Sequence, residues 1–248
     1  MNTKTPHIVG VGNALVDVVA AVTPEVIARH GLQTGGMYLV DAAAAQSLFE
    51  EVGPGVRQSG GSVANSIAHL ADLGVSGTYL GKTAEDDLGR SFAEEMRGMG
   101  IDAPIAPGPA SETGTGRCVV LVTPDGERTM STYLGAAVTL KPTDLTDVMP
   151  ASFDILFVEG YLWDAPHGAA VIETAAQAAK TAGAKVAMTP SDAGCVERNR
   201  DVMLNFIAQH ADILIGNHVE IGALAGQEDA GAAMDWALCH VGIAAVTE

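Results

Sequence analysis

Short apolar runs alternate with longer amphipathic segments along almost the whole chain. Runs such as 154–160 and 211–217 are almost continuously apolar, which is typical of strands buried on both faces of a parallel sheet. The segments between the runs have the length and the period of helices. The alternation therefore predicts an α/β fold, a mostly parallel sheet with helices on both faces. The expected strands span residues 7–12, 75–82, 154–160, 185–190, 211–217 and 242–248, and the expected helices span 62–74, 86–100, 169–183 and 197–210.

One region interrupts this alternation. Residues 116–134 read as two strands joined by a Pro-Asp-Gly sequence at 124–126, which is typical of a hairpin turn. Residues 35–41 offer one more strand. We expect these segments to form a small antiparallel β appendage, which the Pro- and Gly-rich residues 103–116 connect to the core.

The balance of charges restricts the possible partners. The 248 residues include 30 Asp and Glu against 13 Lys and Arg, which gives a formal charge of −17. Such an acidic chain is repelled by the phosphate backbone of nucleic acids and by anionic lipids. Aromatic residues make up 4% of the chain, so few side chains can stack on single-stranded bases. We expect neither a nucleic-acid partner nor a membrane partner.

Three cysteines and the N-terminal sequence bear on the compartment. Cys118, Cys195 and Cys239 lie far apart and form no C-x-x-C pair, so we expect free thiols in a reducing compartment. The N-terminal residues lack the pattern of a signal peptide, and no apolar run reaches the roughly 18 residues of a membrane span. The predicted location is the cytoplasm.

Polar residues follow the first expected strand. Ligands bind at the carboxyl ends of the strands in open parallel sheets. Asn13 and Asp17 place an amide and a carboxylate there, and a carboxylate can accept hydrogen bonds from two vicinal hydroxyls. The alternative is that both side chains only satisfy backbone amides of the turn. Either way, we expect a βα turn at this point.

A pair of glycines opens the helix expected at 62–74. Gly60 and Gly61 precede Ser62, which we expect to be the N-cap, and this leaves free N–H groups at the positive end of the helix. Asn65 lies in the first turn and can point at the same ligand. The alternative is an ordinary glycine-rich turn with a solvated Asn65.

A second amide–carboxylate pair follows the strand at 211–217. Asn217 and Glu220 lie three residues apart at the start of a helix, where a carboxylate can hold Mg²⁺ through water. The alternative is a capping box, in which the two side chains satisfy each other's backbone. Two phosphate-binding patterns fail: Leu15 replaces the third glycine of G-x-G-x-x-G, and residues 77–83 are one residue short of a P-loop.

Taken together, four stretches resemble the ribokinase/adenosine kinase (PfkB) family of sugar and nucleoside kinases. They are GNALVD at 12–17, the glycine-rich region at 60–89, GERTMSTYLGAA at 126–137 and NHVE at 217–220. The resemblance implies a three-layer ribokinase-like α/β core with a small β-sheet lid. It implies a single domain over residues 1–248, with the lid formed by about 13–41 and 112–134.

The resemblance also implies site residues. Asn13 and Asp17 would contact the sugar hydroxyls, and Gly60, Gly61 and Asn65 would complete that pocket. Glu159 and Tyr161, just after the strand at 154–160, are weaker substrate-binding candidates. Asn217 and Glu220 would organise Mg²⁺ and the phosphates, with Glu220 as the metal ligand. Arg128 is a candidate for a lid arginine near the transferred phosphoryl group, and the alternative is an exposed hairpin arginine.

The implied reaction is transfer of the γ-phosphoryl group of ATP to a primary hydroxyl of a nucleoside, preferably adenosine-like, or of a sugar. Its implied cofactors are ATP and Mg²⁺, and its partner is a small molecule. Members of the family often dimerise through the lid, so a homodimer is also expected.

One family motif is absent. The Gly-Ala-Gly-Asp segment that supplies the catalytic base in the family does not occur in this chain, which stops at an expected strand. We therefore expect a chain that lacks its C-terminal part, with the base beyond Glu248. The alternative is a non-catalytic sugar- or nucleoside-binding fragment or pseudokinase. A nicotinamide-dependent oxidoreductase is a third hypothesis, which Leu15 already disfavours.

Overall fold

A computed structural model describes residues 5–109 and 113–247 of the chain. Its main element is a six-stranded sheet with the strand order β11-β10-β9-β8-β1-β5. Every pair of neighbouring strands in this sheet is parallel, which confirms the predicted α/β fold. The strands are β1 (His7–Val11), β5 (Ser76–Leu80), β8 (Ile155–Glu159), β9 (Lys185–Thr189), β10 (Ile213–Asn217) and β11 (Ile243–Thr247).

Successive side chains of each strand point to opposite sides of this sheet. Helices cover both faces of β1, β5 and β8, whereas Ile215 of β10 and Ile243 of β11 are exposed. In β1, Val9 and Val11 face one buried cluster and Ile8 faces another. The first cluster includes side chains of α5 (Pro142–Thr146), α6 (Gly168–Ala182), α7 (Ala193–His210), α8 (His218–Ala225) and α9 (Ala230–His240). The second includes α3 (Ser62–Asp72) and α4 (Asp87–Gly98). Within the described ranges, no helix has the length and hydropathy needed to cross a membrane.

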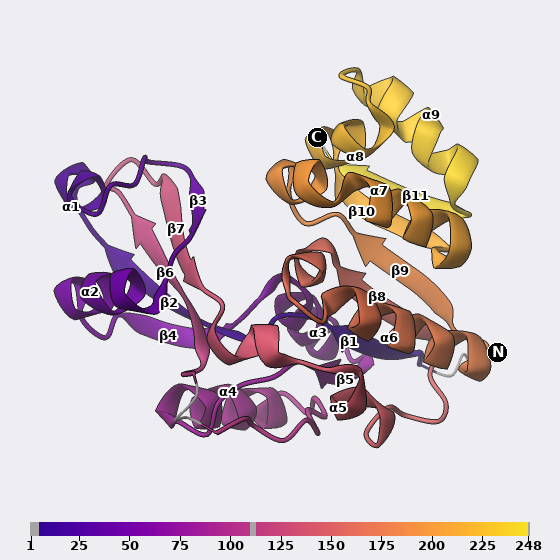
Figure 1. The fold of residues 1–248 in the computed structure, drawn as a ribbon, viewed down its shortest axis with the longest axis horizontal. Coiled ribbons are helices and arrows are strands. Elements are labelled where there is room, and N and C mark those ends of the chain that lie inside the picture. Colours follow the sequence, from indigo (N-terminus) through magenta and orange to yellow (C-terminus); the bar gives the residue numbers. More distant parts are fainter. Residues whose placement is uncertain (1–4, 110–112, 248) are drawn as a thin grey trace.

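A second sheet forms a separate lobe, on the left in Figure 1. Its five strands have the order β3-β7-β6-β2-β4. Ile27 and Leu48, from α1 and α2, pack on Val119 and Leu121 of one sheet face. The bounds are β2 (Leu15–Ala21), α1 (Pro24–Arg29), β3 (Met37–Leu39), α2 (Ala42–Val52), β4 (Val56–Gly60), β6 (Gly116–Val122) and β7 (Arg128–Tyr133), with 3₁₀ turns η1 (Gly135–Thr139) and η2 (Gly160–Asp164) outside the sheets.

The second sheet differs from the expectation in two respects. It is mixed rather than antiparallel, because β2 pairs in parallel with β6, and β3 with β7. The predicted hairpin is present, since β6 and β7 are antiparallel neighbours. The expected lid ranges omitted β4, which pairs with β2. Three of the five residues of β4 are exposed, so its sequence shows no apolar alternation. Residue 112, the expected start of the second range, lies outside the described residues.

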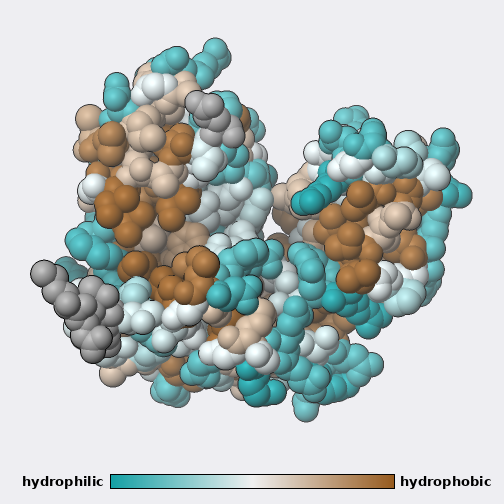
Figure 2. Space-filling model, turned by 180° about the vertical axis from the view of Figure 1, so that it is seen from behind, coloured by the Kyte–Doolittle hydropathy of each residue, from teal (hydrophilic) through white to brown (hydrophobic). Residues whose placement is uncertain are grey.

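The connection after β1 also corrects the prediction. Residues 12–14 lead directly into β2 rather than into a helix, so the expected βα turn is wrong. Val11 is the last residue of a core strand, and Leu15 is the first residue of the second sheet. The chain therefore crosses from one sheet to the other within three residues, which places β2 beside the carboxyl edge of the parallel sheet. Seen from behind, the molecule is hollowed between two lobes (Figure 2).

Candidate functional site

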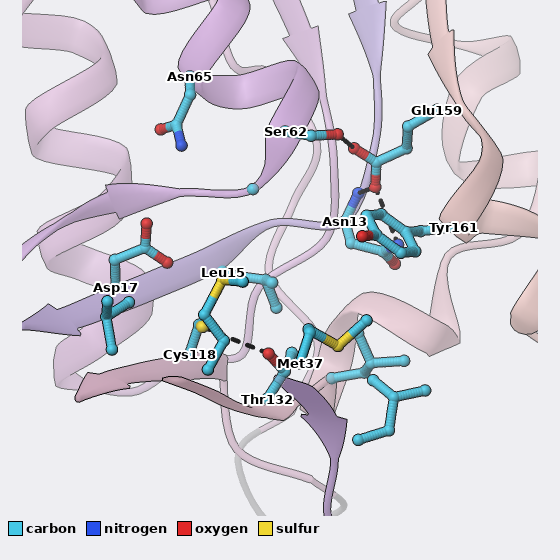
Figure 3. Close-up of a pocket in the computed structure, with 15 residues that line it drawn as sticks. Asn13, Leu15, Asp17, Met37, Ser62, Asn65, Cys118, Thr132, Glu159 and Tyr161 are labelled. Carbon is cyan, nitrogen blue, oxygen red and sulfur yellow. Dashed lines mark hydrogen bonds between the residues drawn. The ribbon is translucent and has the colours of Figure 1, made fainter. Parts of the chain in front are cut away.

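A cavity of about 250 Å³ lies where the second sheet meets the carboxyl edge of the parallel sheet. Residues from both sheets and from the start of α3 line it (Figure 3). Its two ends differ in chemistry. The polar and glycine lining is Asn13, Asp17, Gly61, Ser62, Asn65, Thr132, Glu159 and Tyr161, and the remaining lining is Leu15, Met37, Leu39, Cys118, Val120, Met130 and Leu134.

Asp17 and Asn65 meet across the polar end. Asp17 lies in β2 and Asn65 in the first turn of α3, and their side chains point toward one another (Figure 3). Burial raises the pKa of Asp17 to about 6, although the neighbouring Asn65 amide opposes this shift. Gly60 provides the space for the carboxylate, because a Cβ atom there would lie 2.3 Å from the Asp17 Cγ. The structure therefore brings together three residues that the sequence placed in one site.

Gly61 sets the position of the helix start. It is the N-cap of α3, with φ of 102°, a backbone conformation that favours glycine. A Cβ atom at this residue would lie 2.3 Å from the carbonyl oxygen of Asn13. The prediction that Ser62 is the N-cap is therefore wrong. Ser62 is the first helical residue, and its hydroxyl donates instead to Oε2 of Glu159 at 2.6 Å.

Glu159 is buried at the floor of the cavity and has four protein donors. Its Oε1 accepts from the backbone N–H and from Nδ2 of Asn13, at 2.7 and 2.9 Å. Its Oε2 accepts from the Ser62 hydroxyl and from the backbone N–H of Val63, at 2.6 and 3.2 Å. Burial raises the pKa of Glu159, and these donors oppose the shift. Both oxygens are thus engaged with the protein, which ties the residues after β1 to the start of α3.

Asn13 presents an oxygen that the described part of the chain leaves without a donor. Its Nδ2 is held by Glu159, while its Oδ1 is buried and accepts no hydrogen bond from any described residue. A buried acceptor without a partner costs about 1–3 kcal/mol. Because Asn13 lines the cavity, a ligand hydroxyl is a fitting donor to this oxygen.

The opposite end is apolar and uncharged. The lining side chains of the second sheet, polar and apolar alike, lie at every second position of its strands, as in Leu15 and Asp17 of β2 or Met130 and Thr132 of β7. Burial raises the pKa of Cys118 to about 12, so its thiol is neutral near pH 7. The Thr132 hydroxyl donates to that sulfur at 3.3 Å. Most of these lining residues were not predicted from the sequence, although their period of two along adjacent strands is the signal that predicts a shared face.

Asn217 and Glu220 lie outside this cavity and form the capping box that was the alternative prediction. The Asn217 Oδ1 accepts from the Glu220 backbone N–H at 2.9 Å, and the Glu220 Oε2 accepts from the Asn217 N–H at 3.1 Å. Burial raises the pKa of Glu220, and the nearby Asp192 contributes. The residues that the structure describes contain no cluster of three or more His, Cys, Asp or Glu that could hold a metal ion. A lone carboxylate still fits Mg²⁺ that keeps most of its water.

The other two candidates differ in position. Tyr161, in η2, lines the cavity. Arg128 is exposed at the start of β7, beside the hairpin turn, and is not among the described residues that line the cavity. The structure therefore does not bring Arg128 to the other predicted site residues, because the turn lies at the end of β7 farthest from Thr132 and Leu134.

Two kinases of known activity are similar to this chain in sequence. Guanosine-inosine kinase of Escherichia coli (strain K12) is 27% identical over 272 residues, which cover 97% of this chain and 59% of the relative. Adenosine kinase of Saccharomyces cerevisiae is 30% identical over 149 residues, which cover 57% of this chain and 43% of the relative. The chain thus spans about 59% of the length of the first of these relatives.

Solved structures share the fold. Adenosine kinase from Sinorhizobium meliloti is 37% identical, with a TM-score of 0.90 over 98% of this chain and 75% of that one. A probable sugar kinase from Rhizobium etli CFN 42 is 35% identical, with a TM-score of 0.91 over 98% of this chain and 74% of that one. The model of the pfkB family of carbohydrate kinases matches residues 37–246, most of the chain. The chain belongs to the pfkB family of carbohydrate kinases.

Proposed function

We propose that the protein binds a nucleoside in this cavity and transfers the γ-phosphoryl group of ATP to a primary hydroxyl of that nucleoside. The observation that carries the proposal is the division of the cavity into a polar end, with Asp17 facing Asn65, and an apolar end. A nucleoside has the same division, with hydroxyls on its ribose and a flat ring at the other side. The names of two relatives, guanosine-inosine kinase and adenosine kinase, agree with this class of acceptor.

The polar end is suited to a pair of neighbouring hydroxyls. The two oxygens of the Asp17 carboxylate can accept from vicinal hydroxyls, and charge-assisted hydrogen bonds of this kind are strong. The Asn65 amide lies opposite and can donate or accept. The Asn13 Oδ1 offers one more acceptor. These three residues would hold and orient the acceptor, and accurate orientation is a large part of what a kinase contributes to phosphoryl transfer.

The apolar end is suited to a base and gives a reason to prefer a nucleoside over a free sugar. Leu39, Val120 and Met130 line it, and none of these side chains carries an oxygen or nitrogen to pair with sugar hydroxyls. A free sugar would leave this surface uncovered, whereas a base buries it and gains about 25 cal/mol per Å² of apolar area. We therefore propose an adenosine-like acceptor.

We assign the phosphate donor to ATP with Mg²⁺, at the carboxyl edge near β10. Bound Mg²⁺ neutralises charge on the phosphates during transfer. Glu220 is the carboxylate that would hold its water shell, and Asn217 keeps Glu220 in place through the capping box. Asn217 is the last residue of β10 and Glu220 lies in the first turn of α8, at the same edge of the sheet where Glu159 ends β8.

A homodimer through the second sheet and a cytoplasmic location are further parts of the proposal. Helices α1 and α2 cover one face of the second sheet, and residues on its strands line the cavity. Its edge strands β3 and β4 are therefore the surfaces that we propose for a partner. Free thiols, of which Cys118 and Cys195 are buried, suit the reducing cytoplasm.

Calorimetric titration tests the choice of acceptor. We expect adenosine to bind at least about tenfold more tightly than ribose, because ribose lacks the base that covers the apolar end. Equal affinities for ribose and adenosine would contradict the proposal. In the natural protein, Mg-ATP should convert the bound nucleoside to its monophosphate, measured by chromatography. Binding without this product would favour the non-catalytic alternative.

A further inference from the structure

We propose that Glu159 makes this cavity selective for neutral substrates. Glu159 holds the Asn13 amide so that its oxygen is left for a ligand hydroxyl. It also occupies the start of α3, the helix end that a phosphate would need. The selected acceptors carry free hydroxyls at the polar end, and acceptors with a phosphate there are rejected. The inference rests on the proposed function, since it takes the hydroxyls to lie beside Asp17.

The first step is the orientation of the Asn13 amide. Oε1 of Glu159 accepts from both the backbone N–H and Nδ2 of Asn13. The reversed amide would bring Oδ1 against the carboxylate oxygen, and two acceptors would then repel each other. Glu159 therefore fixes Oδ1 of Asn13 on the other side of the amide. Asn13 is only 2% exposed, and its Oδ1 accepts no hydrogen bond from the described residues.

The second step is the set of groups that this orientation leaves for the ligand. Oδ1 of Asn13 and both oxygens of the ionised Asp17 carboxylate are acceptors only. A hydroxyl can donate to each of them, while the oxygens of a phosphate dianion cannot. Among the described residues that line the cavity, none is Lys, Arg or His, so a phosphate finds no cation in the lining.

The third step concerns the start of α3. Two glycines before a helix leave N–H groups that ordinarily bind anions. Here the protein supplies its own anion, because Oε2 of Glu159 accepts from the Val63 N–H and from the Ser62 hydroxyl. Three of the four donors to Glu159 are N–H groups, which can only donate, so they favour the ionised carboxylate. An ionised Glu159 at this helix end opposes a second negative charge.

The test compares adenosine with adenosine 3′-monophosphate, which keeps the base and replaces one vicinal hydroxyl by a phosphate. We expect the wild-type protein to bind the 3′-monophosphate at least 100-fold more weakly than adenosine. Glu159→Gln removes the charge and frees the Asn13 amide to turn, so this preference should fall at least tenfold. The matched control is Glu173→Gln on α6, outside the cavity, where a half-exposed carboxylate pairs with His210. The control should keep the wild-type preference.

A second measurement uses the wild-type protein alone, so that it does not depend on the folding of Glu159→Gln. We expect 3′-amino-3′-deoxyadenosine, which donates, to bind at least tenfold more tightly than 3′-deoxy-3′-fluoroadenosine, which does not. Equal affinities for the amino and fluoro analogues would overturn the inference. So would a folded Glu159→Gln variant that keeps the wild-type preference for adenosine over its 3′-monophosphate. In either case, binding of adenosine would leave the proposed function intact. Failure of adenosine itself to bind would overturn both.

Discussion

Replacing Asp17 by Asn is expected to weaken adenosine binding about 100-fold or more and, at the same time, to stabilise the ligand-free protein at neutral pH. The loss of affinity follows from the loss of two charge-assisted hydrogen bonds, each worth about 1.5–3 kcal/mol. The asparagine keeps one acceptor oxygen and presents an NH₂ group to the second hydroxyl. Titration calorimetry of the two proteins with adenosine measures this loss.

The gain in stability follows from the pKa of Asp17, which burial raises from 3.8 to about 6. Between these two pH values the folded protein binds more protons than the unfolded chain, so the free energy of unfolding falls as the pH rises. Above pH 6 the full cost of the buried charge, of the order of 3 kcal/mol, is present. Below the unfolded pKa it is absent.

Asp17→Asn removes that cost, so urea unfolding should show a more stable variant at pH 8 and little difference near pH 3.5. The matched control is Asp235→Asn, an exposed position on α9, which should change neither affinity nor stability. An Asp17→Asn protein that binds adenosine as tightly as the wild type would contradict the assignment of Asp17. A variant that is less stable at pH 8 would contradict the account of its buried charge.

Replacing Gly61 by Ala is expected to cost roughly 3 kcal/mol of stability or more and to abolish nucleoside binding. The φ of 102° at Gly61 is a conformation that residues with a Cβ atom rarely adopt, and such backbone strain costs about 1–3 kcal/mol. The new Cβ would also lie 2.3 Å from the Asn13 carbonyl oxygen, so the backbone around Asn13 or the start of α3 must shift. Either shift moves Asn13 or Asn65 out of position.

Gly31→Ala is the matched control for this prediction. Gly31 also has a positive φ, 71°, but a Cβ atom there would meet no other atom within 4 Å. It should therefore show only the conformational cost of about 1–2 kcal/mol, with adenosine binding intact. Urea unfolding and calorimetry separate the two variants, and equal losses in both would show that the close approach of Gly61 to Asn13 is unimportant.

The parallel core was predictable because burial on both faces requires apolar residues at every position. Residues 154–160 and 211–217 show this pattern directly, and the structure has β8 and β10 there. Burial of the second strand on both faces was wrong, because Ile215 of β10 is 38% exposed. The strand β4 was not predictable in the same way, since its exposed residues 56–58 carry no apolar alternation. The small second sheet was predictable from the Pro-Asp-Gly turn at 124–126 and the strands on either side of it, and the resemblance to a known family agreed with it.

The site was predictable where polar residues follow the end of a strand or lie at the start of a helix. Asn13, Asp17 and Asn65 were found in this way, although Asp17 lies in a strand rather than in a turn. The role of Glu159 was not predictable, because its hydroxyl donor, Ser62, is 97 residues away in the sequence. A contact between residues so distant in the chain depends on how α3 packs beside β8. Arg128 had a plausible sequence context, but the hairpin places it away from the cavity.

A crystal structure of the protein with adenosine would test the central claim most directly. We expect the two ribose hydroxyls at roughly 2.6–3.2 Å from the Asp17 carboxylate oxygens, with a third contact to Asn65 or to Oδ1 of Asn13. The base should lie among Leu39, Val120 and Met130. Adenosine bound elsewhere, or no bound adenosine at a concentration that saturates the calorimetric signal, would contradict the account.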